Sequence, residues 1–423
     1  MEIVQSPRSA SLRSGRVSGR QLHALLLLML IYTCHAIDRG IVSVLVEPIK
    51  REFGVSDKAM GFVPLAFSIT FILAVLPIGA LIDRVNRVRL LALLLGIWSL
   101  MTATAGFATT LPLLIASRMA VGAAEAGAQP ICLSLLSDTF PARRRSSALG
   151  IFYLATGLGS IISFLGGGMI TAALGWRFTF LMGGLPGLLL VPVLLLTLRE
   201  PARGTMDGRA ATNDDTIPSM GAAFRFAIAS RPVRLVLLGT LLSSFVLGSF
   251  LAWVPAFLMR EHGLTIKMAG LSAAIAGGLT PALGAIIWGF VADHLGRKHR
   301  ERVGLTCAIS AVGMAICGIA VASSTSTASA LAWLVLFGLF GGGWMAPALA
   351  LLIGLTPLRM RGSLLAIAQI FTALGSGVGP FVVGSFSDLF HRLASGLMIG
   401  AAIGLGAMLL YLAGVRSAAG RMA

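Results

Sequence analysis

Apolar stretches long enough to cross a lipid bilayer recur along the whole 423-residue chain, and they constrain its fold more than any other feature. A helix needs roughly 20 apolar residues to cross a hydrocarbon core about 30 Å thick. Hydrophobic residues make up 57% of the chain and charged residues only 12%, which differs strongly from a soluble domain. The sequence therefore predicts an all-α membrane protein.

Twelve spans are predicted, and the distribution of basic residues supports that number. About three quarters of the 33 Lys and Arg residues fall in segments on one side when both ends of the chain are placed there, a bias typical of the cytoplasmic side. Both termini are thus expected in the cytoplasm, and the protein in the plasma (inner) membrane. The predicted spans are residues 21–46, 58–82, 88–109, 111–137, 146–171, 177–198, 232–259, 267–292, 303–323, 327–354, 362–388 and 393–415.

Internal similarity divides the chain into two halves. Glu52–Gly61 (EFGVSDKAMG) resembles Glu261–Gly270 (EHGLTIKMAG), and Gly79–Arg87 resembles Gly289–Arg297, both at an offset of about 210 residues. Paired repeats are typical of secondary transporters, which bind substrate between the repeats. We expect a cytoplasmic N-terminal tail (1–20), a six-helix bundle (21–198), a cytoplasmic linker (199–231), a second six-helix bundle (232–415) and a cytoplasmic C-terminal tail (416–423).

The formal charge of +17 raises the question of a nucleic-acid partner. The basic residues are scattered among short loops rather than gathered on one surface, which argues against nucleic-acid binding. The four cysteines have spacings that suit neither a metal site nor a disulfide framework. No metal and no cofactor is therefore expected.

Charged residues inside the spans indicate a candidate site. Arg118 and Glu125 in the fourth span are seven residues apart, about two helical turns, so they share a helix face. The first span holds His35, Asp38 and Arg39. A charge at the bilayer centre costs ~2.5–3.5 kcal/mol on insertion scales, so such residues normally face a bundle interior or a water-filled cavity.

The sequence allows more than one role for each of these residues. Asp38 is either a proton-coupling switch, which takes a proton when Arg39 or Arg118 moves away, or half of a permanent structural pair. Glu125 is either a proton site or a partner of Arg118. The arginines can also bind an anionic head group, because a guanidinium offers a planar fork of donors. His35 is expected to pack between helices or to position a neighbouring side chain.

Two loops carry the same motif, Gly79-x-x-x-Asp83-Arg84-x-Asn86-Arg87 and Gly289-x-x-x-Asp293-His294-x-Gly296-Arg297. The doubled motif resembles the signature loops of the major facilitator superfamily, and the resemblance covers about residues 21–415. It implies twelve helices in two pseudo-symmetric six-helix bundles. The motif suits a conformational lock, in which a carboxylate caps a helix of the other half, although the loops could also only set topology. The lock residues would be Gly79, Asp83, Arg84, Arg87, Gly289, Asp293 and Arg297.

Within that superfamily the chain is most similar to the spinster branch. The resemblance rests on Asp38-Arg39, Arg118-x-x-x-Gly122-x-x-Glu125-Ala126, the segment GWRFTF at Gly175–Phe180, and Gly375-x-Gly377-x-Gly379-Pro380. Spinster relatives are associated with transport of sphingosine-1-phosphate or lysophospholipids, which a buried aspartate and glutamate are proposed to couple to protons. The resemblance implies proton coupling at Asp38 and Glu125.

The spans of the second half carry aromatic side chains where the first half has charges. If these line a cavity, one charged wall and one apolar wall would suit an amphipathic molecule; otherwise they pack or face lipid. Gln369 is the plainest polar candidate on this side, and Glu47, near the outer boundary of the first span, is expected to be solvated. The candidate lining residues are Phe245, Trp253, Phe340, Trp344 and Phe371.

The sequence thus predicts a proton-coupled secondary transporter that works by alternating access. Its expected partners are an amphipathic small molecule, protons and membrane lipids, and it is expected to be a monomer. A carrier of hydrophilic organic anions or drugs is the rival, and a non-transporting lipid sensor or scaffold is a further alternative. The chain has no HExxH or GxSxG motif, so an enzyme is not expected.

Overall fold

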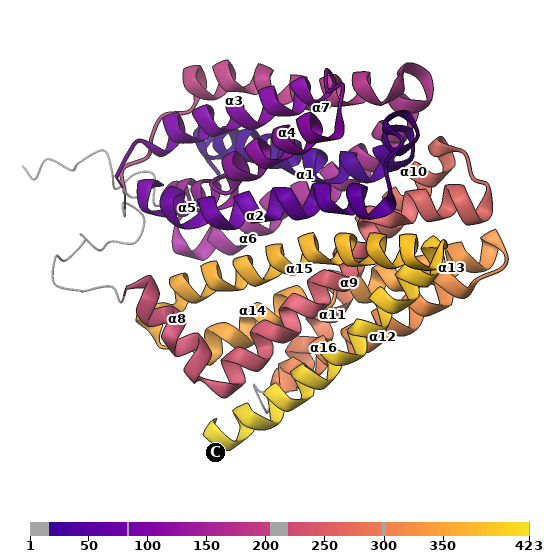
Figure 1. Cartoon of the computed structure of the whole chain (residues 1–423). Coiled ribbons are helices and arrows are strands. Elements are labelled where there is room, and N and C mark those ends of the chain that lie inside the picture. Colours follow the sequence, from indigo (N-terminus) through magenta and orange to yellow (C-terminus); the bar gives the residue numbers. More distant parts are fainter. Residues whose placement is uncertain (1–16, 83, 204–218, 298–301, 423) are drawn as a thin grey trace, which may run out of the picture.

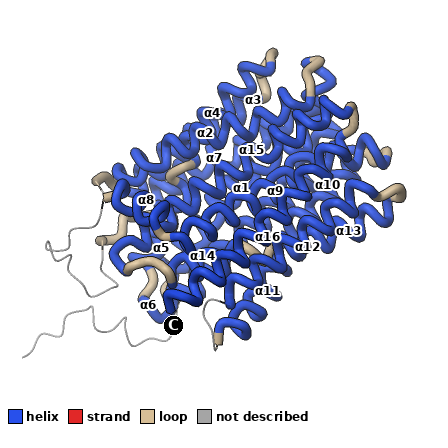
Figure 2. Tube along the Cα trace, turned by 60° about the horizontal axis from the view of Figure 1, so that its bottom comes forward, coloured by secondary structure: helices blue, strands red, loops and turns tan. Residues whose placement is uncertain are grey.

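A computed structural model describes residues 17–82, 84–203, 219–297 and 302–422. Within these ranges the chain is helical and contains no strand, which confirms the all-α prediction. The helices lie side by side and are joined by loops at the two ends of the bundle (Figure 1, Figure 2). We call the end at which α1 begins and α16 ends the terminal end, and the other the opposite end.

In the first half of the chain, the described residues form seven α-helices and one π-helical turn. They are α1 (Gly19–Phe53), α2 (Asp57–Ile82), α3 (Arg87–Ala105), α4 (Leu111–Glu125), α5 (Ala128–Thr139), α6 (Ala142–Ile161), the turn η1 (Ile162–Gly166) and α7 (Gly167–Thr197). α4 and α5 follow each other with a short break and together make one membrane-length segment.

The second half repeats this arrangement after a short additional helix. Its elements are α8 (Met220–Ala229), α9 (Arg231–His262), α10 (Ile266–Ala274), the π-turn η2 (Ile275–Leu279), α11 (Thr280–Gly296), α12 (Val303–Ser323), α13 (Thr327–Gly341), α14 (Met345–Gly354), the 3-10 turn η4 (Leu358–Met360), α15 (Arg361–Phe390) and α16 (Leu393–Met422).

The described chain contains eleven apolar helical segments long enough to cross a membrane. They give twelve crossings, because one segment is long enough to cross twice. This segment, Arg143–Thr197, has 55 residues, far more than the roughly 20 that one crossing needs. It breaks at Gly175, whose φ of 84° and ψ of 166° are not helical. The segment therefore crosses twice, which confirms the predicted fifth and sixth spans.

The sequence repeat reappears as equivalent helix ends. Gly54 ends α1 and Gly263 ends α9, with φ of 62° and 64°, and the two glycines occupy matching positions in the repeated segments. Glycine is the residue that adopts this left-handed conformation without a steric penalty, and it commonly ends helices. The repeat thus encodes where the first membrane-spanning helix of each half stops.

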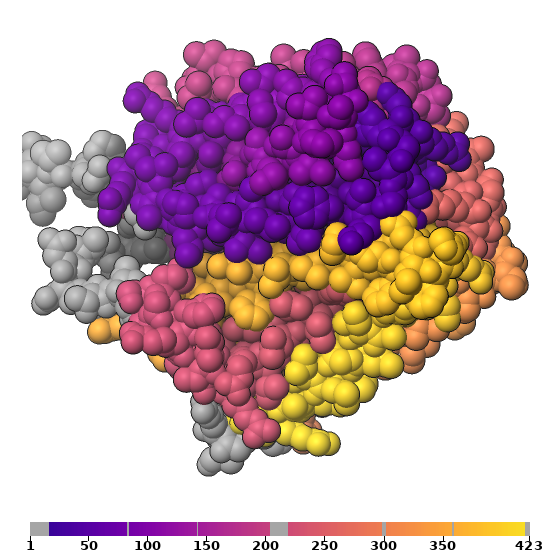
Figure 3. Space-filling model, in the orientation of Figure 1, coloured from indigo at the N-terminus to yellow at the C-terminus, as the bar shows by residue number. Residues whose placement is uncertain are grey.

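The two halves pack most closely along α2 and α15, with the first half above the second in Figure 3. Small residues allow this contact. A Cβ added at Gly61 would lie 2.5 Å from the carbonyl oxygen of Pro380, and one added at Gly384 would clash with the Asp57 backbone. Close backbone approach through glycine is typical of helix pairs in membranes.

The outer surface of the bundle is apolar, as lipid contact requires. Large side chains such as Leu73, Leu196 and Phe290 are mostly exposed. A soluble protein rarely exposes so much apolar surface, so the surface agrees with a multi-pass membrane protein.

Helices extend into two segments that the sequence predicts as linker and tail. α8 lies inside the predicted linker 199–231, of which residues 204–218 are outside the described ranges, and α16 continues through Met422. α1 begins at Gly19 with a capping box between Ser18 and Gln21, an arrangement that satisfies free backbone groups at a helix start. Residues 1–16 of the predicted N-terminal tail lie outside the described residues.

Candidate functional site

A buried ion pair joins α1 to α4. Asp38 and Arg118 are only 4% and 2% exposed, and Arg118 Nη1 donates to Asp38 Oδ1 at 2.8 Å. Thr102 of α3 accepts from Arg118 Nη2 at 2.9 Å and donates to the other Asp38 oxygen. The Arg118 guanidinium also lies 5.2 Å from the centre of the Phe180 ring, a cation–π contact. All these residues belong to the first half, so the pair does not depend on the second.

Glu125 faces His35 rather than Arg118. Its Oε2 lies 3.0 Å from His35 Nδ1, but the contact lacks hydrogen-bond geometry, and no described residue donates to either Glu125 oxygen. Both side chains are buried, and the Tyr32 ring stacks on His35 with 4.9 Å between ring centres. A buried carboxylate without donors is costly when ionised alone. Of the described residues, His35 is thus the group placed to compensate the buried Glu125 carboxyl.

Arg39, next to Asp38 in the chain, is placed quite differently. It is exposed, and no carboxylate of the described residues lies within ion-pair distance of it. Its guanidinium carbon lies 5.2 Å from the Phe67 ring centre and 5.6 Å from that of Phe71, both on α2. Phe71 packs against Ala373 of α15. Arg39 is thus an unpaired cation at mid-helix depth, beside two aromatic rings and close to the second half.

Gln369 makes a polar contact between the halves. Its Nε2 donates to Gln129 Oε1 on α5, and Gln129 Nε2 donates to the Tyr153 hydroxyl at 3.1 Å. Tyr153 is 43% exposed and meets Tyr32 edge-on, and Tyr32 stacks on His35. A chain of polar and aromatic contacts therefore leads from Gln369 to the buried Glu125. Gln129 and Tyr153 are not among the sequence-based candidates.

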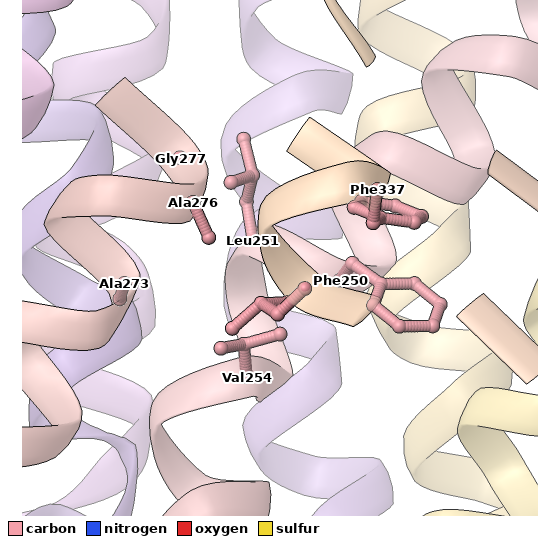
Figure 4. A pocket seen from close by; sticks show the side chains of 8 residues that line it. Phe250, Leu251, Val254, Ala273, Ala276, Gly277 and Phe337 are labelled. Atoms are coloured by element: carbon pink, nitrogen blue, oxygen red, sulfur yellow. The ribbon is translucent and has the colours of Figure 1, made fainter. Parts of the chain in front are cut away.

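The five aromatic candidates of the second half are mainly packing residues here. Phe245, Trp253 and Trp344 are buried in the hydrophobic core, and Phe340 packs against it; Phe371 packs against a second cluster. None of the five lines the small apolar cavity shown in Figure 4, which is formed by Phe250, Leu251, Val254, Ala273, Ala276, Gly277, Leu334 and Phe337. Its volume of about 10 Å³ is no more than a single water needs, so it cannot hold a cargo molecule in this conformation.

Charged side chains of both halves meet at the opposite end of the bundle. Arg260 of α9 donates to both oxygens of Asp57 on α2, at 2.6 and 2.8 Å, and its Nε donates to Glu47 Oε1 at 2.5 Å. Lys50 also donates to Asp57. Glu47 is only 5% exposed. The expectation that Glu47 is solvated is therefore wrong, because Arg260 from the other half covers it.

The second half also caps the first turn of α2. Asp388 of α15 accepts hydrogen bonds from the backbone N–H of Asp57 at 3.0 Å and of Lys58 at 2.8 Å. Ser387 donates to Asp57 Oδ2 at 2.6 Å. A carboxylate at a helix start satisfies free N–H groups and complements the helix dipole. We call Glu47, Lys50, Asp57, Arg260, Ser387 and Asp388 the opposite-end cluster.

The signature-loop residues at the terminal end make few contacts between the halves. A Cβ added at Gly79 or Gly289 would meet nothing within 4 Å, so no helix packs closely against either. Arg84, Asp293 and Arg297 are exposed; Asp83 lies outside the described residues.

Arg87, the last residue of the first loop motif, bonds to α5 and to the chain directly after α7 rather than to the second half. It donates to Asp138 at 2.6 Å, to Glu200 at 2.6 Å and to the carbonyl of Pro201 at 2.9 Å. Arg87 is almost fully buried. It therefore holds the chain that follows α7 against the start of α3.

Comparisons with known proteins agree with this fold. The family model "Major Facilitator Superfamily" matches residues 28–309 and 237–421. An efflux pump of the same type from Mycolicibacterium smegmatis is 30% identical over 85% of this chain and 83% of its own. A sphingosine-1-phosphate transporter from Danio rerio is 29% identical over 83% of this chain and 73% of its own. A probable L-galactonate transporter from Escherichia coli is 27% identical over 98% and 94%.

A solved structure extends the similarity to the spinster branch. A bacterial homolog of the human lysosomal transporter spinster, in an inward-facing and unoccupied conformation, matches with a TM-score of 0.81 and 25% identity. The match covers 95% of this chain and 98% of the other. The resemblance to spinster proteins inferred from the sequence is confirmed, and the relatives are transporters rather than enzymes. The chain belongs to the Major Facilitator Superfamily of membrane transporters.

Proposed function

We propose that this transporter moves an amphipathic, lipid-like anion by alternating access and couples the movement to protons. The observation that carries the proposal is Arg39, an exposed cation without an ion-pair partner among the described residues, flanked by the rings of Phe67 and Phe71 and next in the chain to the buried Asp38–Arg118 ion pair. Residues 21–198 and 232–415 would act as the two domains that rock against each other, joined by the linker 199–231. The proposed working unit is a monomer.

Arg39 is proposed to bind the head group of the cargo. Arg39 is exposed and has no ion-pair partner among the described residues, so its guanidinium can bind an anion without first breaking an internal ion pair. Its planar donors suit a phosphate or carboxylate, while Phe67 and Phe71 provide apolar surface for the adjoining carbons. A head group and an apolar chain can thus be bound side by side, as an amphipathic molecule requires.

Asp38 is proposed to respond to the cargo through Arg118. Asp38 accepts from Arg118 and Thr102, and the buried Arg118 Nε has no hydrogen-bond partner among the described residues. An anion that drew Arg118 away would leave Asp38 buried without its counter-charge, which favours protonation. The cargo and the proton would then be linked at one side chain.

Glu125 and His35 form a proposed second proton site. No described residue donates to Glu125, and the His35 ring, whose Nδ1 lies 3.0 Å from Glu125 Oε2, is the group placed to exchange a proton with it. The contacts through Tyr32, Tyr153 and Gln129 to Gln369 connect this pair to the surface between the halves. A proton change there could thus be transmitted to the second half.

The proposed orientation has both termini in the cytoplasm and the protein in the plasma membrane. The bias of Lys and Arg toward the terminal end supports it. The opposite-end cluster then lies outside and holds the halves together there, whereas Gly79 and Gly289 at the cytoplasmic end have no close neighbour. We infer an inward-facing conformation, and the similarity to an inward-facing spinster homolog supports this inference.

A hydrophilic organic anion is the second candidate cargo. Relatives from Escherichia coli and Bacillus subtilis are described as transporters of galactonate or of galactarate and glucarate, and a carboxylate would suit Arg39 as well as a phosphate does. The aromatic rings of Phe67 and Phe71 beside Arg39, however, offer apolar surface next to the charge, which favours the amphipathic cargo.

Reconstitution distinguishes the two cargo classes. The purified protein in liposomes should take up a labelled lysophospholipid or sphingosine-1-phosphate, and uptake should depend on an imposed pH gradient. Uptake of galactonate without any lysolipid uptake would replace the first proposal with the second. Binding of lysolipid without flux would make the protein a sensor or scaffold.

Replacing Arg39 by glutamine should raise the KM for cargo by about tenfold or more, because a charge-assisted hydrogen bond contributes roughly 1.5–3 kcal/mol. The thermal unfolding temperature should hardly change, since Arg39 is exposed and makes no ion pair with a described residue. Arg39→Lys is the matched control: it keeps the charge, loses the planar fork and should give an intermediate KM. A KM unchanged in Arg39→Gln would remove Arg39 from the binding site.

Glu125→Gln should flatten the pH profile of uptake, because the substituted amide cannot exchange a proton with its surroundings. The measurement is the initial uptake rate at a series of equal inside and outside pH values. His35→Gln, which leaves the carboxyl in place but removes the imidazole beside it, should shift the profile rather than flatten it. A Glu125→Gln profile that overlays the parent curve would contradict a proton site here.

A further inference from the structure

A groove between α9 and α16 at the terminal end combines two arginines with an apolar wall. It has a volume of about 430 Å³ and is lined by Arg231, Leu409, Leu412, Ala413, Arg416 and Ser417. No acidic residue belongs to this lining. The two helices are in contact beside the groove: a Cβ added at Gly414 of α16 would lie 3.6 Å from Leu235 Cβ of α9.

Neither arginine of the groove is neutralised within the described part of the chain. Both are exposed, and no described carboxylate lies within ion-pair distance of Arg231 or Arg416. Two guanidinium groups that border one groove repel each other, and an anion placed between them removes that repulsion. Their planar donors suit phosphate oxygens in particular.

Neighbouring side chains place the groove at the edge of the apolar surface. Leu409 is 60% exposed and lies seven residues before Arg416 on α16, about two turns and therefore on the same face. α8, directly before Arg231, exposes Phe224 and Ile228, one turn apart. An exposed apolar face of this kind on a short helix is typical of a segment lying in the membrane interface. The arginines thus lie at the depth of lipid head groups and the leucines at the depth of acyl chains.

We propose that this groove binds one anionic phospholipid. Arg231 and Arg416 hold its phosphate, Ser417 offers a hydroxyl donor, and an acyl chain runs along Leu409 and Leu412. Basic pockets between spanning helices are known recognition sites for anionic head groups. A zwitterionic lipid presents the same phosphate, but its ammonium group would meet the second arginine. The inference concerns the second half alone and does not depend on the cargo or on proton coupling.

Native mass spectrometry of the purified, delipidated full-length protein tests the proposal. We expect phosphatidylglycerol to bind more tightly than phosphatidylethanolamine, and the double variant Arg231→Gln/Arg416→Gln to lose about tenfold or more of that affinity. The matched control is Arg89→Gln/Arg302→Gln, which removes two other exposed arginines at the ends of helices. It should bind phosphatidylglycerol like the parent. Thermal unfolding of each variant without lipid verifies that both are folded.

Three outcomes would overturn the site. Equal loss of affinity in both double variants would mean a diffuse attraction to the basic end of the bundle. Equal binding of phosphatidylglycerol and phosphatidylethanolamine would remove the preference for an anionic lipid. Thermal stabilisation by inorganic phosphate as large as that by phosphatidylglycerol, abolished in Arg231→Gln/Arg416→Gln, would show a site for a soluble anion.

Discussion

Replacing Asp38 by asparagine should abolish uptake driven by a pH gradient and also lower the stability of the protein. The asparagine keeps one acceptor for Arg118 or Thr102 but leaves the buried Arg118 charge without a counter-charge. Breaking a buried ion pair typically costs ~3–5 kcal/mol, and the remaining hydrogen bond should reduce that loss. Thermal unfolding in detergent and uptake into liposomes are measured on the same preparation.

The double variant Asp38→Asn/Arg118→Gln distinguishes a role of Asp38 in proton coupling from a purely structural role of the Asp38–Arg118 ion pair. It removes both charges, so it should recover most of the stability that the single variant loses. If Asp38 exchanges protons during transport, pH-driven uptake remains absent in the double variant. Recovery of pH-driven uptake together with stability would show that the pair is purely structural.

Replacing Arg260 by glutamine should shift the transporter toward a conformation open at the opposite end. Arg260 holds Asp57 and Glu47 of the first half, and both carboxylates are buried. Losing this charged contact between the halves should cost the closed conformation at least ~1.4 kcal/mol, or about tenfold in its population. The labelling rate of a single cysteine introduced at Ser385, on α15 near the cluster, should rise accordingly.

Arg177→Gln provides the matched control for that experiment. Arg177 pairs with Glu52 at 2.6 Å near the same end, but both residues belong to the first half. Its loss removes an ion pair without removing a contact between the halves, so the labelling rate should stay at the parent value. Equal rates in Arg260→Gln and the parent would mean that the opposite-end cluster does not hold the closed conformation.

The membrane-spanning segments could be predicted from the sequence because their signal is local. Val303–Ser323 forms α12 with the bounds predicted for the ninth span. The break between the fifth and sixth spans needs a residue that tolerates φ of 84°, and Gly175 provides it. The helix α8 was not predicted because ten residues are too short to signal a span.

The candidate site was predictable only in its charged members. Asp38 and Arg118 are conspicuous because charges are rare in apolar helices, whereas Thr102 contributes one hydroxyl that its sequence context does not distinguish. Gln129 could have been found, since it lies one turn after Glu125. Glu47 and Arg260 are 213 residues apart, so no local pattern predicts that they meet.

The hydrogen bonds that Asp388 accepts must break when the two halves separate at the opposite end. While the two halves are in contact at the opposite end, the Asp388 carboxylate accepts hydrogen bonds from the first backbone N–H groups of α2. When the halves separate, several water molecules must hydrate both the helix start and the released carboxylate. The opening equilibrium therefore includes an uptake of water, which makes it sensitive to osmotic stress as well as to cargo and protons.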